Sequence, residues 1–352
     1  MKKTIFCLAA GAMALTACTS TDVIEEGIQS NAIGFQTVVG KQSRATDLTK
    51  ANLNNFQVYS YYTITGKEGN PVSVFDGEAV TLKDGAWSYT NTRYWVPGAT
   101  YYFYAYSCGN QKMTSNNGVP AINTTNAGVM TQGFTLSDFS CNSTHQHDLI
   151  FATNEGYIAK EAAAENQPAA NSKVGFTFKH ILTKVNAEFT SEFAPGYDIE
   201  VSNVQISNIR DNGDFNSTKE EGQEWTATRS ANDMFVNLGL TEPNNVASNA
   251  ETADQIKKAI TDAAYVIPHE YTESEVKLTF NIKVKQGNDT FLDRNLTGTW
   301  KPNWKMGYSY TYKIAITGTT ANLEPIVFET AENMNVEGFE EGSAPEINFS
   351  AN

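Results

Sequence analysis

The sequence is poor in positive charge and in residues that carry chemistry. It has 4 His and 4 Cys in 352 residues, and 25 Lys and Arg against 39 Asp and Glu, which gives a formal net charge of −14. Binding to nucleic acid needs a basic patch over the phosphates, so we expect no nucleic acid among the partners. The motifs of serine hydrolases, zinc proteases and phosphate-binding loops are all missing. We therefore predict that the protein is not an enzyme and uses no cofactor.

A metal site is not expected either. His145 and His147 lie two residues apart, so on a strand they would share a face that a metal could use. Asp138 and Asp148 lie nearby in sequence, but no third ligand of matching type is placed with the two imidazoles. His180, on an apolar strand face, is interpreted as a histidine satisfied within the core.

The only apolar run at the N-terminus, residues 5–14, is too short to span a bilayer as a permanent helix. It follows Lys2 and Lys3 and ends in Leu-Thr-Ala-Cys at Cys18, which resembles the bacterial lipobox. By that resemblance, residues 1–17 are a signal peptide, Cys18 is acylated, and residues 18–32 are a tether to the cell outer membrane. The alternative is an ordinary secretory signal.

Cysteine usage leaves one candidate pair. Cys7 departs with the signal and Cys18 carries lipid, so Cys108 and Cys141 remain. Export permits a disulfide between them, worth about 3–4 kcal/mol in the chain-entropy model. Two unpaired thiols are the other reading, and the sequence does not choose between them.

What the chain does have is aromatic residues in strand patterns. Residues 87–106 read as two aromatic strands joined by a turn at residues 96–99, where Pro97 and Gly98 suit a type II turn. After the turn, Tyr101 and Phe103 point one way and Tyr102 and Tyr104 the other, so we expect this strand in the middle of a sheet.

Regular short strands without a βαβ rhythm predict an all-β fold. Alternating patterns mark strands at residues 33–39, 56–64, 174–189 and 308–316, and a phase change after Leu182 predicts a bulge or a change of sheet. Residues 251–264 have the spacing of one short amphipathic helix. An Ala-rich stretch at residues 160–172 suggests a boundary between domains at residues 33–160 and 173–352.

Several of these segments together resemble the fimbrillin family of Bacteroidales, in the Mfa-like branch that builds type V pili. The segments are the lipobox at Cys18 and residues 43–46, 94–98, 102–106, 148–152, 176–180, 264–268 and 304–312.

The resemblance implies two tandem transthyretin-like β-sandwich domains. The helix expected from the spacing of residues 251–264 falls in the second. It also implies lipoprotein export and cleavage by a trypsin-like protease, which here would cut between Arg44 and Ala45. The first strand, residues 33–39, would then leave. A strand from the C-terminal tail of another fimbrial subunit, residues 323–352, would take its place.

Three alternatives stay open. The loop containing Arg44 could be exposed and unprocessed. The tail, whose apolar pieces are residues 326–328 and 347–349, could be a last strand with a frayed end. The protein could also be a surface lipoprotein that does not polymerise and binds glycans through exposed aromatic residues.

Overall fold

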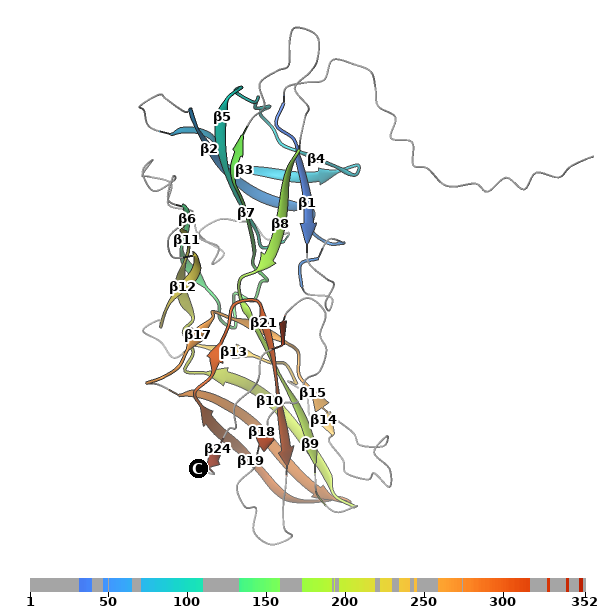
Figure 1. Cartoon of the computed structure of the whole chain (residues 1–352). Coiled ribbons are helices and arrows are strands. Elements are labelled where there is room, and N and C mark those ends of the chain that lie inside the picture. The colour runs from blue at the N-terminus through green and yellow to red at the C-terminus, as the bar shows by residue number, and fades with distance from the viewer. Residues whose placement is uncertain are drawn as a thin grey trace, which may run out of the picture.

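The computed structural model describes residues 32–39, 47–49, 51–64, 71–109, 133–158, 173–191, 193, 196–218, 222–229, 234–240, 244–245, 259–273, 275–316, 328–329, 340–341 and 348–350. Every regular element among these residues is a β-strand, and they form two lobes (Figure 1). The expected all-β class with tandem sandwiches is confirmed. None of the residues placed by the structure forms a helix long and apolar enough to cross a membrane.

The first lobe is one strongly curved sheet around an aromatic core. Its strands, in spatial order, are β1 (Phe35–Val39), β8 (Val174–His180), β7 (Ile150–Ile158), β5 (Ala99–Ser107), β2 (Asn55–Ile64), β3 (Val72–Lys83) and β4 (Ala86–Ser88). All neighbours are antiparallel except β1 and β8, which are parallel. The buried face holds Phe56, Phe103 and Phe176, among others. β1 is an edge of this sheet.

The second lobe packs two larger sheets face to face. One sheet contains β13 (Phe235–Asn237), β10 (Asp198–Ser207), β18 (Val276–Gln286), β19 (Asp289–Trp300) and β24 (Asn348–Ser350), with β14 (Asn244–Asn245) also on β10. The other contains β15 (Ala259–Ile260), β9 (Thr183–Ser191), β21 (Tyr308–Ile316) and β22 (Phe328–Glu329), with β16 (Ala264–Val266) on β9 and β23 (Glu340–Glu341) on β21. A short pair, β17 (His269–Glu270) and β20 (Asn303–Trp304), lies beside them.

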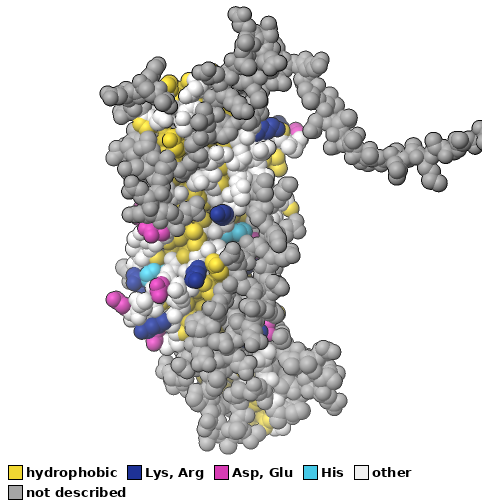
Figure 2. All heavy atoms as spheres, in the orientation of Figure 1, with side chains coloured by type: hydrophobic (Ala, Val, Ile, Leu, Met, Phe, Trp, Pro, Cys, Tyr) yellow, Lys and Arg dark blue, Asp and Glu magenta, His cyan; other side chains and the backbone are white. Residues whose placement is uncertain are grey.

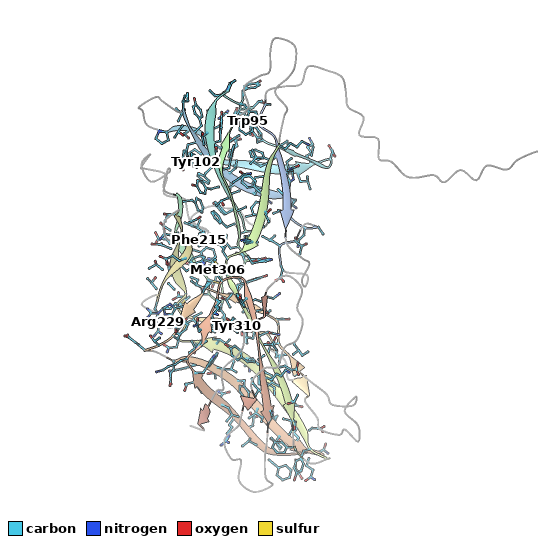
Figure 3. All side chains as sticks on the ribbon, viewed as in Figure 1. Trp95, Tyr102, Phe215, Arg229, Met306 and Tyr310 are labelled. Atoms are coloured by element: carbon cyan, nitrogen blue, oxygen red, sulfur yellow. The ribbon has the colours of Figure 1, made fainter. Side chains whose placement is uncertain are left out.

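A third sheet and a third core join the lobes. The sheet consists of β12 (Gly222–Thr228), β11 (Asn212–Thr218) and β6 (Gly133–Ser140), so a strand from each half of the chain contributes. Phe215 is fully buried in this core and Met306 packs against it; Figure 3 shows both between the lobes. The two lobes therefore share apolar surface, although they are separate in sequence.

The aromatic strand after Gly98 is central, as expected, but its partner is different. Tyr101 and Phe103 lie in the first core, and Tyr104 lies in the third. The turn is confirmed, because the Ala99 N–H donates to the Val96 carbonyl and Gly98 has a φ of 75°. The expected hairpin is wrong: β5 pairs with β2 and β7, and β4 pairs with β3.

Packing explains why no hairpin forms. Trp95 turns inward onto Tyr101, with ring centroids 4.7 Å apart, and the Tyr101 hydroxyl accepts the Val96 N–H at 2.8 Å. The chain before the turn is therefore a loop. That loop covers the start of β1, because the Ile33 N–H donates to the Arg93 carbonyl at 2.8 Å.

The predicted helix at residues 251–264 is wrong where the structure can test it; residues 251–258 lie outside the described part. Ala259 pairs with Phe189 and Ala264 pairs with Val185, so both belong to strands along β9. Between them, the Thr261 hydroxyl accepts the Ala187 N–H at 2.8 Å. These long-range hydrogen bonds outweigh local helix propensity.

The phase change after Leu182 marks a change of sheet, which was one of its two interpretations. β8 ends at His180 in the first lobe, and β9 begins at Thr183 in the second. The chain therefore crosses between lobes at Ile181 and Leu182, later than the boundary expected at residues 160–172. The wholly buried side chains of Ile181 and Leu182 belong to the third core.

Candidate functional site: the edge strand β1 and the buried anchor after it

β1 is an edge strand with inward side chains deep in the first core. Ile33, just before it, is 2% exposed and Phe35 is 3% exposed, whereas Gly34 between them is half-buried and Gln36 after Phe35 is exposed. This alternation is the two-residue period of a strand with one buried face. β1 pairs with β8 at five positions, beginning with Phe35 opposite Val174. The strand expected at residues 33–39 is therefore confirmed.

Phe35 occupies an aromatic pocket. Its ring centroid lies 5.8 Å from that of Phe56, 5.5 Å from Phe75, 5.7 Å from Tyr89, 6.4 Å from Phe103 and 5.9 Å from Phe176. Four of these contacts are edge-to-face and the last is stacked, which are the favourable geometries for aromatic pairs. Departure of β1 would take the Phe35 contact away from each of the five rings.

β8 depends on β1 for most of its backbone pairing. β7 pairs with β8 only at the far end, where Ile150 is opposite His180 and Phe151 opposite Lys179. Over residues 174–178 the described strand paired with β8 is β1. Backbone N–H and C=O groups left without partners are costly when buried and adhesive when exposed. Without β1, this edge of the sheet would need another strand.

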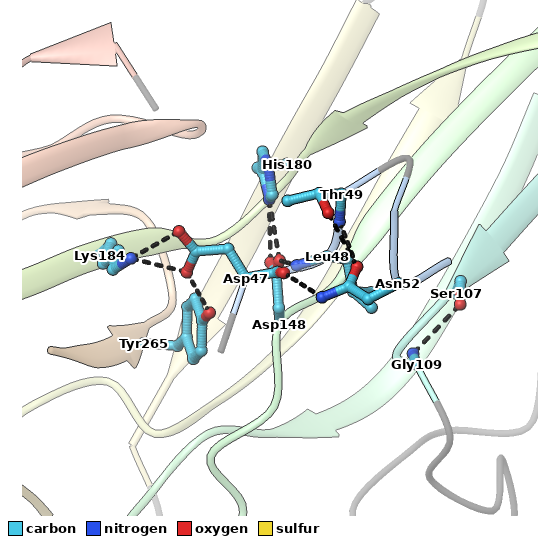
Figure 4. Close-up of polar contacts among 10 residues, drawn as sticks. All are labelled: Asp47, Leu48, Thr49, Asn52, Ser107, Gly109, Asp148, His180, Lys184 and Tyr265. Carbon is cyan, nitrogen blue, oxygen red and sulfur yellow. Dashed lines mark hydrogen bonds and ion pairs between the residues drawn. The ribbon is translucent and has the colours of Figure 1, made fainter. Parts of the chain in front are cut away.

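The chain after β1 is held by a cluster of buried polar groups, which we call the Asp47 anchor. It consists of Asp47, Leu48, Asp148, His180, Lys184 and Tyr265 (Figure 4). Lys184 is in β9 and Tyr265 is in β16, so two members belong to the second lobe. Asp148 precedes β7 and His180 ends β8, so two belong to the first.

An ion pair forms the half of the anchor on the second lobe. The Lys184 ammonium lies 2.6 Å from each carboxylate oxygen of Asp47, and the side chains are 4% and 0% exposed. The Tyr265 hydroxyl donates to Asp47 Oδ1 at 2.6 Å. A buried carboxylate is tolerated when it is paired and hydrogen-bonded in this way. Asp47 is therefore fixed on the second lobe.

The half of the anchor on the first lobe binds the backbone of the segment that follows Asp47. The Leu48 N–H donates to Asp148 Oδ2 at 2.7 Å, and Asp148 Oδ1 lies 3.0 Å from His180 Nδ1. The Asn52 side chain adds two local bonds, accepting the Thr49 N–H at 2.6 Å and donating to the Asp47 carbonyl at 2.8 Å. His180 is thus a buried histidine of the core, as predicted, and its Nδ1 is paired with Asp148.

The sequence alone does not predict this anchor. Its charged members are far apart in sequence, and Asp47 stands 137 residues from Lys184. One signal was present: Lys184 lies in a strand whose apolar residues are buried on both faces, where an unpaired lysine would be costly. That pattern predicts that Lys184 pairs with a buried Asp or Glu, but it does not identify the residue.

The residues predicted for processing fall outside the described part of the chain. This is the case for Cys18, Arg44 and Ala45, and for most of the tail at residues 323–352. Within the tail the structure places β22, β23 and β24, each two or three residues long.

Cys108 and Cys141 are free, buried thiols, which was the second of their two interpretations. Burial raises the pKa of the Cys108 thiol to about 12 and also raises the pKa of Cys141. The Cys141 thiol donates to the Tyr265 carbonyl at 3.1 Å. Both groups stay protonated at neutral pH, so neither behaves as a nucleophile.

Tryptophan does not provide an exposed sugar platform. Trp95, Trp300 and Trp304 are buried, and Trp87 and Trp225 pack against the first and third cores. Trp87 and Trp225 are nevertheless only half-buried, and Tyr94 and Phe291 are 60% and 61% exposed, so glycan binding through exposed aromatic residues stays an alternative prediction.

The described residues form no metal cluster. No three His, Cys, Asp or Glu side chains among them gather closely enough to hold a metal ion. Instead, His145 donates its backbone N–H to the Asn142 carbonyl at 3.0 Å. On the face drawn in Figure 2, the visible Lys and Arg side chains lie near Asp and Glu and form no broad basic surface.

The comparison with protein families decides where the chain belongs. A family model described as fimbrillin-like matches residues 43–331, which is most of the sequence. The chain belongs to the fimbrillin-like family. The match begins after β1 and includes the whole Asp47 anchor. No curated protein sequence matches the chain.

Solved structures from Bacteroides and Porphyromonas species are similar at low identity. A candidate cell adhesion protein from Bacteroides eggerthii is 13% identical with a TM-score of 0.47, and the match covers 91% of this chain and 96% of that one. One from Bacteroides uniformis is 16% identical with a TM-score of 0.41, covering 84% and 96%. The fimbrial anchor protein Mfa2 from Porphyromonas gingivalis is 12% identical with a TM-score of 0.34, covering 84% and 97%.

Proposed function

We propose that this fimbrillin-like protein is a non-enzymatic structural subunit of a fimbria on the bacterial surface, where it supports adhesion. It is exported as a lipoprotein and held at the outer membrane through lipid on Cys18. A trypsin-like protease cuts between Arg44 and Ala45, β1 leaves, and a strand from another copy or another fimbrial subunit fills the opened edge.

One observation supports this exchange most directly: the tail repeats the pattern of β1. Residues 33–37 read Ile-Gly-Phe-Gln-Thr and residues 326–330 read Ile-Val-Phe-Glu-Thr. The three identities fall at alternate positions, so in a strand they share one face. In β1 that face is the inward one, since Ile33 and Phe35 are buried and Gln36 is exposed. The tail segment therefore has the side chains that the opened edge requires, in the same order.

The pairing in the described strands favours such a replacement. β22 pairs with β21 at two positions, whereas β1 pairs with β8 at five. Strand addition at a sheet edge gains one ladder of backbone hydrogen bonds and fills pockets with alternate side chains. Placed on β8 in the direction of β1, residues 326–330 would put Phe328 into the Phe35 pocket.

The test compares two tail variants of the lipid-free Cys18→Ser protein after limited trypsin digestion. We expect native gels of the wild type to show ladders of bands from polymers of increasing length. For Phe328→Ser we expect few such bands or none. Phe349→Ser is the matched control, because Phe349 belongs to the other apolar piece of the tail; its ladders should persist. Lys41→Ala with Arg44→Ala should stay monomeric after digestion, because it removes both basic residues between β1 and Asp47, and Arg44→Ala should abolish surface polymers in cells.

Two results would contradict the proposal. Ladders of Phe328→Ser equal to those of the wild type would exclude the donor segment. Unchanged surface polymers with Arg44→Ala would exclude processing at Arg44. A peptide of residues 324–332 should block ladder formation, and the same peptide with serine at position 328 should not.

A further inference from the structure

The Asp47 anchor lies between two possible cleavage points. Arg44 comes before Asp47, and Lys50 follows it, so a protease that cuts after basic residues has a second target just past the anchor. Cleavage after Lys50 would free residues 45–50 as well as β1. We infer that the Asp47 anchor keeps the chain after the cut seated, so that processing removes β1 and stops there. This inference rests on the proposed removal of β1.

The contacts fit this role because they hold the chain on both lobes. Asp47 is fixed by Lys184 and Tyr265 of the second lobe, and the next residue, Leu48, donates its N–H to Asp148 of the first. None of these bonds involves β1. The departure of β1 therefore leaves these bonds in place.

The anchored segment also forms part of the groove that β1 would leave. Leu48 is 7% exposed and Leu53 is 2% exposed, and both belong to the same core cluster as Phe35. If this segment peeled away, the pocket would lose apolar wall beyond the length of β1. By keeping Leu48 and Leu53 in place, the anchor fixes the end of the groove. The groove then has the length of one short donor strand.

The experiment makes the cut independent of the natural protease. A site-specific protease sequence replaces residues 41–46 in the lipid-free protein, so that Lys50 becomes the first trypsin site after the cut. The variants are an anchor pair, Asp47→Ala with Lys184→Met, and a control pair, Glu200→Ala with Lys285→Met. The control breaks a partly exposed ion pair of the same 2.6 Å length. Mass spectrometry then measures the rate of trypsin cleavage after Lys50.

We expect Lys50 to be cut at least tenfold faster in the anchor pair than in the parent, and at the parent rate in the control pair. Equal rates in parent and anchor pair would overturn the inference. If the anchor pair fails to fold, hydrogen exchange in the parent decides instead. Amide protection at residues 47–49 should survive the cut and the removal of β1, and its loss would overturn the inference. Ladder formation, measured separately, reports on the proposed function and not on the anchor.

Discussion

Truncation of Phe35 tests two roles of β1 separately: its contribution to the stability of the uncut protein and its release after cleavage. Phe35→Ala empties a pocket in which the ring is 3% exposed and contacts five other rings. Phe→Ala in a core costs about 3–5 kcal/mol, as lost burial plus the cavity that remains. The number of ring partners places Phe35→Ala near the upper end. We expect urea unfolding of the uncut protein to show a loss of about 4–5 kcal/mol.

The same substitution should have the opposite consequence for assembly. The lost contacts hold β1 in the groove, so after cleavage β1 should dissociate more readily, and a weakening of about 4 kcal/mol is close to a thousandfold in the equilibrium. Ladders should therefore appear faster from cut Phe35→Ala than from cut wild type. The finished polymers should be equally stable, because β1 is absent from both.

The neighbouring residue provides the control. Gln36 is on the same strand but exposed, so Gln36→Ala should change stability by less than about 0.5 kcal/mol and leave the joining rate unchanged. A cost below about 1 kcal/mol for Phe35→Ala in the uncut protein would contradict the role assigned to this pocket. A joining rate of cut Phe35→Ala no faster than that of cut wild type would contradict it as well.

Three further predictions concern the body of the protein. Lys184→Met should destabilise by about 3–5 kcal/mol because it leaves Asp47 buried without its cation, whereas adding Asp47→Leu should restore most of the loss in urea unfolding. Phe103→Asp buries an unpaired charge at a position with 0% exposure and should give insoluble protein; normal fibres from it would contradict the role of this core. Burial raises the pKa of Tyr271 to about 12. The neutral phenol thus favours the folded state. This contribution is complete below pH ~10, the ordinary tyrosine pKa, and should be lost between pH ~10 and ~12. Stability curves that stay flat across that window would contradict it.

The sequence predicted the elements whose evidence is local. The period of two fixes which side chains share a face, so the strand at residues 33–39 and the two-faced strand after Gly98 were predictable. The turn at residues 96–99 was equally local, because Pro97 and Gly98 favour the required backbone angles. The membership in the fimbrillin-like family was also visible, in short aromatic motifs in the right order.

Pairing of strands was not predictable in the same way. The aromatic segment before Pro97 looks like a hairpin partner, but Trp95 gains more by packing onto Tyr101. The spacing of residues 251–264 fits a helix, yet the unfilled edge of β9 supplies backbone partners that a helix would forgo. In both cases the outcome depends on residues remote in sequence.

The Asp47 anchor shows the same limit at the candidate site. Its bonds span from 32 residues, between Asp148 and His180, to 218 residues, between Asp47 and Tyr265. The sequence by itself determined the all-β class, the strand at residues 33–39 with Ile33 and Phe35 on one face, and the repeat of that pattern in the tail, because each depends on neighbours along the chain. Only the tertiary structure decided that β8 relies on β1 and that Asp47 meets Lys184, because only folding brings those groups together out of water.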